Sequence, residues 1–141
     1  MSRAFFDTNV LVYLFDNRAP EKKIRAQQIF AVEAENGRAV LSTQVLQEFY
    51  WAVTRKLASP LPEEVAEQRV RDFCELPLVR VDAPMILAAI ARGRSQGFSL
   101  WDALILEAAL RAGARRLLTE DLQHGQRIGN LSVENPFREG A

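Results

Sequence analysis

The sequence predicts an α/β fold with an open, mostly parallel sheet and helices on both faces. Short apolar runs of four or five residues, typical of buried strands, alternate with longer segments whose apolar residues recur at helical spacing. With 141 residues, 48% of them hydrophobic, the chain is long enough to form one domain with its own core. We therefore expect a single domain over residues 1–141, without internal repeats or linkers.

The first predicted strand is the apolar run Arg3–Asp7, which ends on a carboxylate. A short buried helix is predicted over Val10–Phe15, because the polar residues just before it are of the kinds that cap helix starts. Pro20–Asn36 is predicted to form an amphipathic surface helix. Further strands are expected at Ala39–Ser42, Leu78–Val81, Arg116–Thr119 and Leu131–Val133.

Four more helices are predicted between and after these strands. One begins at Thr43, and another follows the break at Ser59–Glu63 and ends before Pro77. The last two are expected over Ala83–Ser95 and Ser99–Gly113, and the C-terminal Arg138–Ala141 is expected to fray. The expected buried positions of the first three are Val45, Phe49, Ala52 and Val53, then Ala66, Val70 and Phe73, then Ile86, Ala89 and Ile90.

Composition excludes several classes of function. Cys74 and His124 are the only cysteine and histidine, so zinc sites and Cys–His catalysis are not expected. The sequence has no run of about 18 apolar residues and no signal-peptide pattern, so we expect a cytoplasmic protein without membrane contact. Because 18 basic residues balance 18 acidic ones, any surface that binds nucleic acid must be local.

Four carboxylates occupy positions where parallel α/β sheets place their active sites. Asp7 and Asp121 follow predicted strands, whereas Glu48 and Asp102 belong to helices with apolar neighbours. Each carboxylate taken alone has an ordinary structural explanation. Asp7 could cap a helix, and Glu48 could be a surface carboxylate. Asp102 could belong to a capping box, and Asp121 could stabilise a turn. Two carboxylates 4 Å apart repel by about 4 kcal/mol at an effective dielectric constant of about 20, so a converging set favours a bound cation. Oxygen ligands alone select Mg²⁺ or Mn²⁺.

These residues resemble the four acidic motifs of PIN-domain ribonucleases, and among them most closely those of VapC-like toxins. The resemblance covers nearly the whole chain in order and spacing. It implies a PIN-like three-layer sandwich whose five-stranded parallel sheet has the strand order 3-2-1-4-5. The matching motifs are Asp7-Thr8-Asn9, Gln47-Glu48-Phe49, Ser99-Leu100-Trp101-Asp102-Ala103 and Thr119-Glu120-Asp121.

The resemblance also implies an activity and partners. RNA phosphodiester bonds would be hydrolysed with one or two Mg²⁺ or Mn²⁺ ions, leaving a 5′-phosphate and a 3′-hydroxyl, with Asp102 or Asp121 orienting the attacking water. VapC-like toxins form homodimers and are inhibited by a small cognate antitoxin, so both partners are implied. The implied catalytic and metal-binding residues are Asp7, Glu48, Asp102 and Asp121, supported by Thr8, Asn9, Ser99 and Thr119, although helix capping explains Ser99 and a strand-end hydroxyl explains Thr119 equally well.

Basic and aromatic residues indicate where RNA could lie. Phe98 and Trp101 could stack on bases, whereas Tyr50 and Trp51 are expected at an interface between subunits. His124 is expected in a loop, without a catalytic role. The residues predicted to bind RNA phosphates are Arg18, Lys22, Lys23 and Arg25, with Arg55, Lys56, Arg92, Arg94 and Arg127 as further candidates.

Two other kinds of function were weighed. A haloacid-dehalogenase-like phosphatase needs Asp-x-Asp where this chain has Asp7-Thr8-Asn9, and a response-regulator receiver needs a lysine after a late strand, where this chain has none. The other alternative is a PIN-like module that binds RNA or a partner without cleaving. The complete acidic set favours the nuclease over both.

Overall fold

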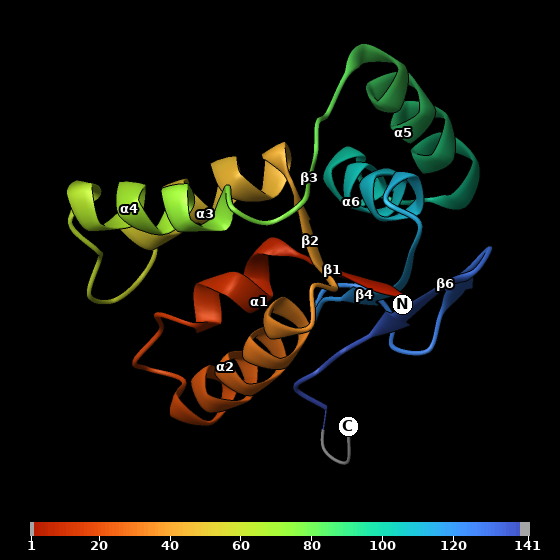
Figure 1. Cartoon of the computed structure of the whole chain (residues 1–141). Helices are drawn as coiled ribbons and strands as arrows, with labels where there is room; N and C mark the ends of the chain where they lie inside the picture. Colours follow the sequence, from red (N-terminus) through yellow and green to blue (C-terminus); the bar gives the residue numbers. More distant parts are fainter. Residues whose placement is uncertain (1, 139–141) are drawn as a thin grey trace.

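A six-stranded sheet forms the centre of the structure, a computed structural model that describes residues 2–138 (Figure 1). The spatial order of the strands is β3-β2-β1-β4-β6-β5, and all neighbours are parallel except β6 and β5. The predicted fold class is confirmed, and the five predicted strands lie in the predicted order. The strands are β1 (Arg3–Phe6), β2 (Ala39–Ser42), β3 (Leu78–Val79), β4 (Ala114–Leu118), β5 (Arg127–Ile128) and β6 (Leu131–Glu134).

Strand β5 was not predicted, because it is two residues long. It forms a tight antiparallel hairpin with β6, in which Ile128 pairs with Leu131. The two residues between them are Gly129 and Asn130, and Gly129 has a φ of 59°. A Gly-Asn pair between two strands is a recognised hairpin signal, so this turn could have been found from the sequence.

All six predicted helices are present, with ends shifted by a few residues. The first begins at Thr8 rather than Val10, because the Asp7 carboxylate caps it by accepting a hydrogen bond from the Thr8 backbone N–H. The residues predicted to fray are described only in part, since 139–141 lie outside the described residues. The helices are α1 (Thr8–Tyr13), α2 (Pro20–Glu35), α3 (Thr43–Arg55), α4 (Glu63–Phe73), α5 (Ala83–Gln96) and α6 (Leu100–Arg111).

Helices α2, α3 and α4 share an aromatic core with β1. Phe6 of β1 contacts Phe30 of α2 edge-on, with ring centroids 5.2 Å apart. The series continues from Phe30 through Phe73 of α4 to Phe49 of α3, at 5.7 Å and 5.0 Å. Such edge-to-face pairs stabilise a core beyond the area they bury. This packing holds α3, and with it Glu48, against the sheet.

The predicted buried face of α5 is partly wrong. Ala89 is fully buried, but Ile86 and Ile90 are 38% and 42% exposed. Met85, not Ile86, is the residue that packs with Ala89 in the interior. The helix is apolar on several sides, so periodicity alone could not choose the face that packs against α6. Leu87 is still more exposed, at 67%, and α5 therefore presents apolar side chains to solvent.

One charged cluster is built into the sheet away from the carboxyl ends of β1 and β4. Glu33 of α2 is buried, and Arg38 donates two hydrogen bonds to its carboxylate, at 2.9 Å and 3.0 Å. Arg116 of β4 also pairs with Glu33, at 3.2 Å, and with Glu134 of β6, at 3.1 Å. These ion pairs join α2 to two strands.

No helix among residues 2–138 combines the length and the hydropathy that a bilayer crossing requires.

Candidate active site

The carboxyl ends of β1 and β4 meet at one edge of the sheet. Phe6 and Leu118 are paired in register, and the Asp7 backbone N–H donates to the Leu118 carbonyl at 3.0 Å. The next residues, Asp7 and Thr119, are therefore neighbours although they lie 112 positions apart in sequence. Both are buried, with exposed fractions of 5% and 0%.

The Thr119 hydroxyl links Asp7 to the turn after β4. It donates to Asp7 Oδ2 at 2.7 Å and accepts from the Asp121 backbone N–H at 3.1 Å. Asn9 braces the same turn, because its amide donates to Thr119 Oγ1 at 3.4 Å and its carbonyl accepts from the Glu120 N–H at 3.3 Å. Three of the side chains expected to support the carboxylates, those of Thr8, Asn9 and Thr119, therefore contact the carboxylates or the turn that bears one of them.

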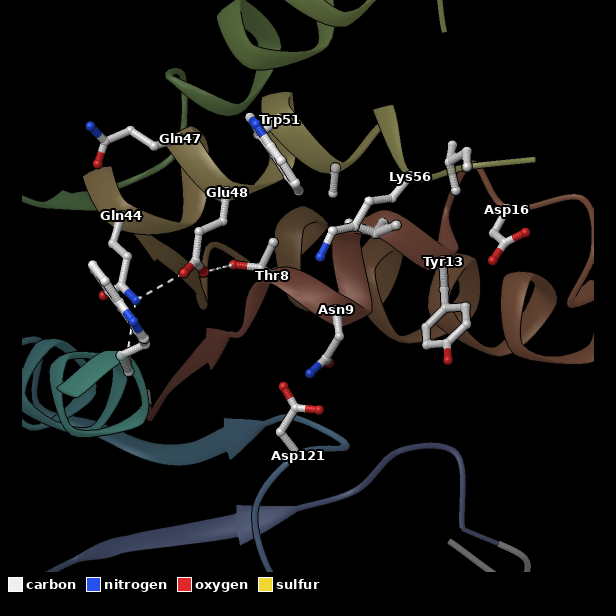
Figure 2. A pocket seen from close by; sticks show the side chains of 14 residues that line it. Thr8, Asn9, Tyr13, Asp16, Gln44, Gln47, Glu48, Trp51, Lys56 and Asp121 are labelled. Carbon is white, nitrogen blue, oxygen red and sulfur yellow. Dashed lines mark hydrogen bonds between the residues drawn. The ribbon is translucent and has the colours of Figure 1, made fainter. Parts of the chain in front are cut away.

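Glu48 reaches the site from α3. Its carboxylate accepts from the Thr8 hydroxyl at 2.7 Å and from the Gln44 amide at 3.3 Å (Figure 2). Gln44 is buried and also donates to the Trp101 carbonyl at 3.2 Å, which links α3 to α6. Sequence reasoning did not single out Gln44. It stands four residues before Glu48 on the same helix, and that spacing could have indicated that the two side chains are neighbours.

Asp102 approaches from the first turn of α6. Ser99 is the N-cap of this helix, and its hydroxyl accepts from the Asp102 backbone N–H at 3.1 Å. The geometry of Ser99 is therefore that of a helix cap. Partial burial raises the pKa of the Asp102 carboxyl, and the charges of Asp121 and Glu48 add to the rise, while hydrogen bonding with Ser99 opposes it.

A groove of about 950 Å³ is lined by two of these carboxylates, Glu48 and Asp121, whereas Asp7 and Asp102 are not among its lining residues. Figure 2 shows Glu48 pointing toward Thr8, with Asp121 on the other side of Asn9. From this acidic end the groove continues along α1 and α3, where Trp51 and Lys56 line it. Lys56 lies over the Trp51 ring, 4.9 Å from its centroid. The acidic residues thus occupy one part of a cleft large enough for part of a polymeric substrate.

Burial raises the pKa of Asp7 from 3.8 to about 7. Hydrogen bonds from Thr119 and from the Thr8 backbone oppose the rise, and the charges of Asp121 and Glu48 add to it. Burial therefore favours the protonated form of Asp7 when no cation is near. A divalent cation would neutralise this repulsion and displace the proton.

The donor set has the chemistry of a hard-cation site. Asp7, Glu48 and Asp121 offer oxygen atoms only, as Mg²⁺ and Mn²⁺ prefer. Within residues 2–138, no three acidic, histidine or cysteine side chains are placed to hold one metal ion together. Mg²⁺ is commonly held by one or two carboxylates with water in the remaining positions, and the residues present fit that mode of binding.

The four basic residues predicted to bind RNA lie around the start of α2, outside the lining of the groove. Three have partners within the chain: Lys22 donates to Glu120 at 2.7 Å, Lys23 to Asn17 at 2.6 Å and Arg25 to the Pro136 carbonyl at 3.0 Å. For Arg18 only a backbone contact is described, from its N–H to Asp16.

The two tryptophans both line the groove, with exposed fractions of 50% for Trp51 and 61% for Trp101. Trp51, expected at a subunit interface, is thus also placed where a substrate could touch it. His124 lies in an exposed loop and accepts from the Asn135 backbone N–H at 3.0 Å, which agrees with its expected loop position.

The sequence and the fold were compared with those of known proteins. The sequence matches the PIN domain family over residues 4–127. No curated protein sequence shows a significant match.

Solved structures with the same fold include components of toxin–antitoxin systems. A toxin–antitoxin complex from Klebsiella pneumoniae is 23% identical, with a TM-score of 0.69 over 96% of this chain and 99% of that one. VapBC bound to DNA from Salmonella typhimurium is 20% identical, with a TM-score of 0.66 over 96% and 99%. VapC20 of Mycobacterium tuberculosis, described as a toxin that cleaves the sarcin-ricin loop, is 20% identical, with a TM-score of 0.62 over 81% and 86%. At these identities the similarity establishes a shared fold.

Proposed function

This chain belongs to the PIN domain family, and from that premise we propose that it is an endoribonuclease that hydrolyses RNA phosphodiester bonds with Mg²⁺ or Mn²⁺. The observation that carries the proposal is that Glu48 and Asp121 line one end of a groove, and that Thr8 and Thr119 link the buried carboxylate of Asp7 to both of their segments. The three carboxylates come from three separate segments, and the raised pKa of Asp7 reflects a burial that no local cation offsets.

The burial and contacts of each side chain suggest its role in the proposed reaction. Asp7, together with Asp121 or Glu48, would hold the ion, which when bound lowers the pKa of a water molecule and neutralises charge on the scissile phosphate. Thr119 and Thr8 hold the two oxygens of Asp7 in place. Asp102, partly buried and on another helix, is suited to orient the attacking water, as is Asp121.

Substrate binding is proposed along the rest of the groove. Lys56 would contact a backbone phosphate, and the exposed rings of Trp51 and Trp101 would stack on unpaired bases. The residues predicted from the sequence around the start of α2, Arg18, Lys22, Lys23 and Arg25, stay a prediction for RNA approaching from outside the groove.

A biological role follows from the same comparisons. We propose that the chain is the toxin of a type II toxin–antitoxin pair, acts in the cytoplasm and is inhibited by a small antitoxin. The support is the shared fold with structures described as VapBC or toxin–antitoxin complexes. A small open reading frame that lies just upstream and encodes a protein binding this chain would support the role.

The activity is tested by incubating purified protein with RNA in Mg²⁺ or Mn²⁺. We expect cleavage products with a 5′-phosphate and a 3′-hydroxyl, loss of cleavage in excess EDTA, and its return when the ion is restored. RNA binding without cleavage under any divalent ion would contradict the nuclease and favour a binding module of the same fold.

We also propose that two copies of the chain pair through α5. Ile86, Leu87 and Ile90 expose apolar area on this helix, and a second copy would bury it. Leu87→Arg is expected to shift the mass measured by light scattering from dimer to monomer. The matched control is Val65→Arg, which changes another exposed apolar residue, on α4, and should leave the mass unchanged. Equal masses for wild type and Leu87→Arg would exclude α5 as the interface.

A further inference from the structure

Glu120 stands between Thr119 and Asp121 in sequence, yet its carboxylate does not line the groove. Its Oε1 accepts at 2.5 Å from the hydroxyl of Tyr13, which itself lines the groove, and its Oε2 accepts from Lys22 Nζ at 2.7 Å. Lys22 also donates to the Tyr13 oxygen at 3.2 Å, so the three side chains form a closed set of contacts. We call Tyr13, Lys22 and Glu120 the Glu120 clamp.

The clamp is itself held by packing. Phe137 contacts the Tyr13 ring edge-on, with centroids 4.9 Å apart, and Lys22 Nζ lies 4.9 Å and 5.6 Å from the centroids of these two rings. Arg25, also on α2, donates to the Pro136 carbonyl at 3.0 Å and so holds the segment that carries Phe137 against α2. The clamp therefore joins α1, α2, the turn after β4 and the C-terminal segment.

Asp121 depends on this turn for its place in the groove. The Asp121 side chain is exposed, and among residues 2–138 no hydrogen bond to its carboxylate is present. The turn is held from the groove side by Thr119 and Asn9, through single hydrogen bonds to backbone N–H groups. The turn is also held by the clamp, whose bonds to a carboxylate are of the stronger, charge-assisted kind.

We propose that Tyr13 and Lys22 are positioning residues that hold Glu120 and thereby fix the turn that presents Asp121 to the metal site. The clamp also selects which of two adjacent carboxylates faces the groove, since Glu120 is engaged elsewhere. This inference rests on the proposed function where it assigns Asp121 to the metal, whereas the ordering of the turn does not depend on activity.

Lys22→Met tests the clamp in the full-length protein by removing the charge and keeping most of the side-chain length. We expect amide hydrogen exchange over residues 119–123 to become about ten-fold faster, as loss of a charge-assisted hydrogen bond would allow. Mn²⁺ should bind about five-fold more weakly, and kcat for RNA cleavage should fall by a similar factor while KM changes less than about two-fold. Tyr13→Phe keeps the ring contact with Phe137 and should shift all three quantities in the same direction.

Two further variants separate the clamp from other effects. Lys23→Met removes the neighbouring lysine of α2, which is bonded to Asn17, and should change neither exchange in the turn nor Mn²⁺ binding. Lys22→Arg keeps the charge and should show an exchange rate close to that of the wild type. If Lys22→Met acted only by loosening the packing, Lys22→Arg would show faster exchange as well.

Unchanged exchange over residues 119–123 in both Lys22→Met and Tyr13→Phe would overturn the proposal. A raised KM in Lys22→Met with unchanged exchange would do so as well, and would mean that Lys22 contacts RNA. If the wild-type protein neither binds Mn²⁺ nor cleaves RNA, the proposed function fails, and the exchange measurement alone decides on the clamp.

Discussion

Asp7→Asn is expected to slow RNA cleavage by at least about a thousand-fold, which corresponds to about 4 kcal/mol of transition-state stabilisation. Asparagine is nearly the same size but is a neutral and much weaker ligand for a hard cation. Initial rates with saturating Mg²⁺ measure the loss. Asp16→Asn is the matched control, since Asp16 is an aspartate that lines the groove beyond the end of α1, and this variant should retain most of the activity.

The same substitution should change how folding stability depends on pH. Because burial raises the pKa of Asp7 from 3.8 to about 7, the folded protein keeps a proton between these values that the unfolded chain has released. Stability of the wild type in EDTA therefore falls as pH rises from about 4 to about 7, by up to about 4 kcal/mol for a shift of this size. Asparagine has no charge to bury and avoids this loss.

Urea unfolding in EDTA at pH 5 and pH 8 measures this effect. The free energy of unfolding of Asp7→Asn minus that of the wild type should become more positive at the higher pH. An asparagine amide has only one acceptor oxygen, so it cannot accept from both the Thr8 N–H and the Thr119 hydroxyl, and the lost hydrogen bond lowers the stability of the variant at both pH values. A difference that is the same at both pH values would show that Asp7 carries no raised pKa.

The second large effect is expected at Glu33, far from the carboxylates in the groove. Glu33→Gln should lower the free energy of unfolding at pH 7 by about 3 kcal/mol, because it leaves Arg38 and Arg116 without the buried charge that they pair with. Glu35→Gln, on the exposed side of the same helix, should change it by less than about 0.5 kcal/mol. Urea unfolding followed by circular dichroism compares the two.

The pH dependence at Glu33 has the opposite sign to that at Asp7. Hydrogen bonds from Arg38, with the nearby charges of Arg116 and Arg38, hold the pKa of Glu33 below its usual value of 4.5. The stabilisation is therefore complete above that value and is lost as pH falls through the lowered pKa. The difference in free energy of unfolding between wild type and Glu33→Gln should therefore become smaller at acidic pH. A gap below about 1 kcal/mol at pH 7 would contradict a stabilising role for the buried pair.

The regular alternation of strand and helix patterns predicted a mostly parallel sheet, whereas the order of the strands was implied by the resemblance to PIN-domain ribonucleases. Buried faces were harder to predict. On α5 apolar residues occur on several sides, so periodicity did not distinguish Met85 from Ile86. Strand β5 was missed because two residues give no periodic signal, although Gly129-Asn130 marked its turn.

In the site, carboxylates at strand ends could be found by position alone, as Asp7 and Asp121 were. Residues that act through tertiary contacts could not. Gln44 meets the Trp101 carbonyl 57 positions away, and Tyr13 meets Glu120 across 107 positions. Clustered positive charge led to the prediction that Lys22 contacts RNA, but the sequence could not show that the Glu120 carboxylate faces it. These partners become visible only when α1, α2 and β4 are assembled.

The central claim is that carboxylates from separate segments bind one hard cation at the end of β1 and β4. Crystals soaked in Mn²⁺ and measured near the manganese absorption edge locate the ion directly by its anomalous signal. We predict a peak about 2.2 Å from a carboxylate oxygen of Asp7 and from one of Asp121 or Glu48, absent in Asp7→Asn. A fully occupied Mn²⁺ site elsewhere, with no peak beside Asp7, would contradict the account.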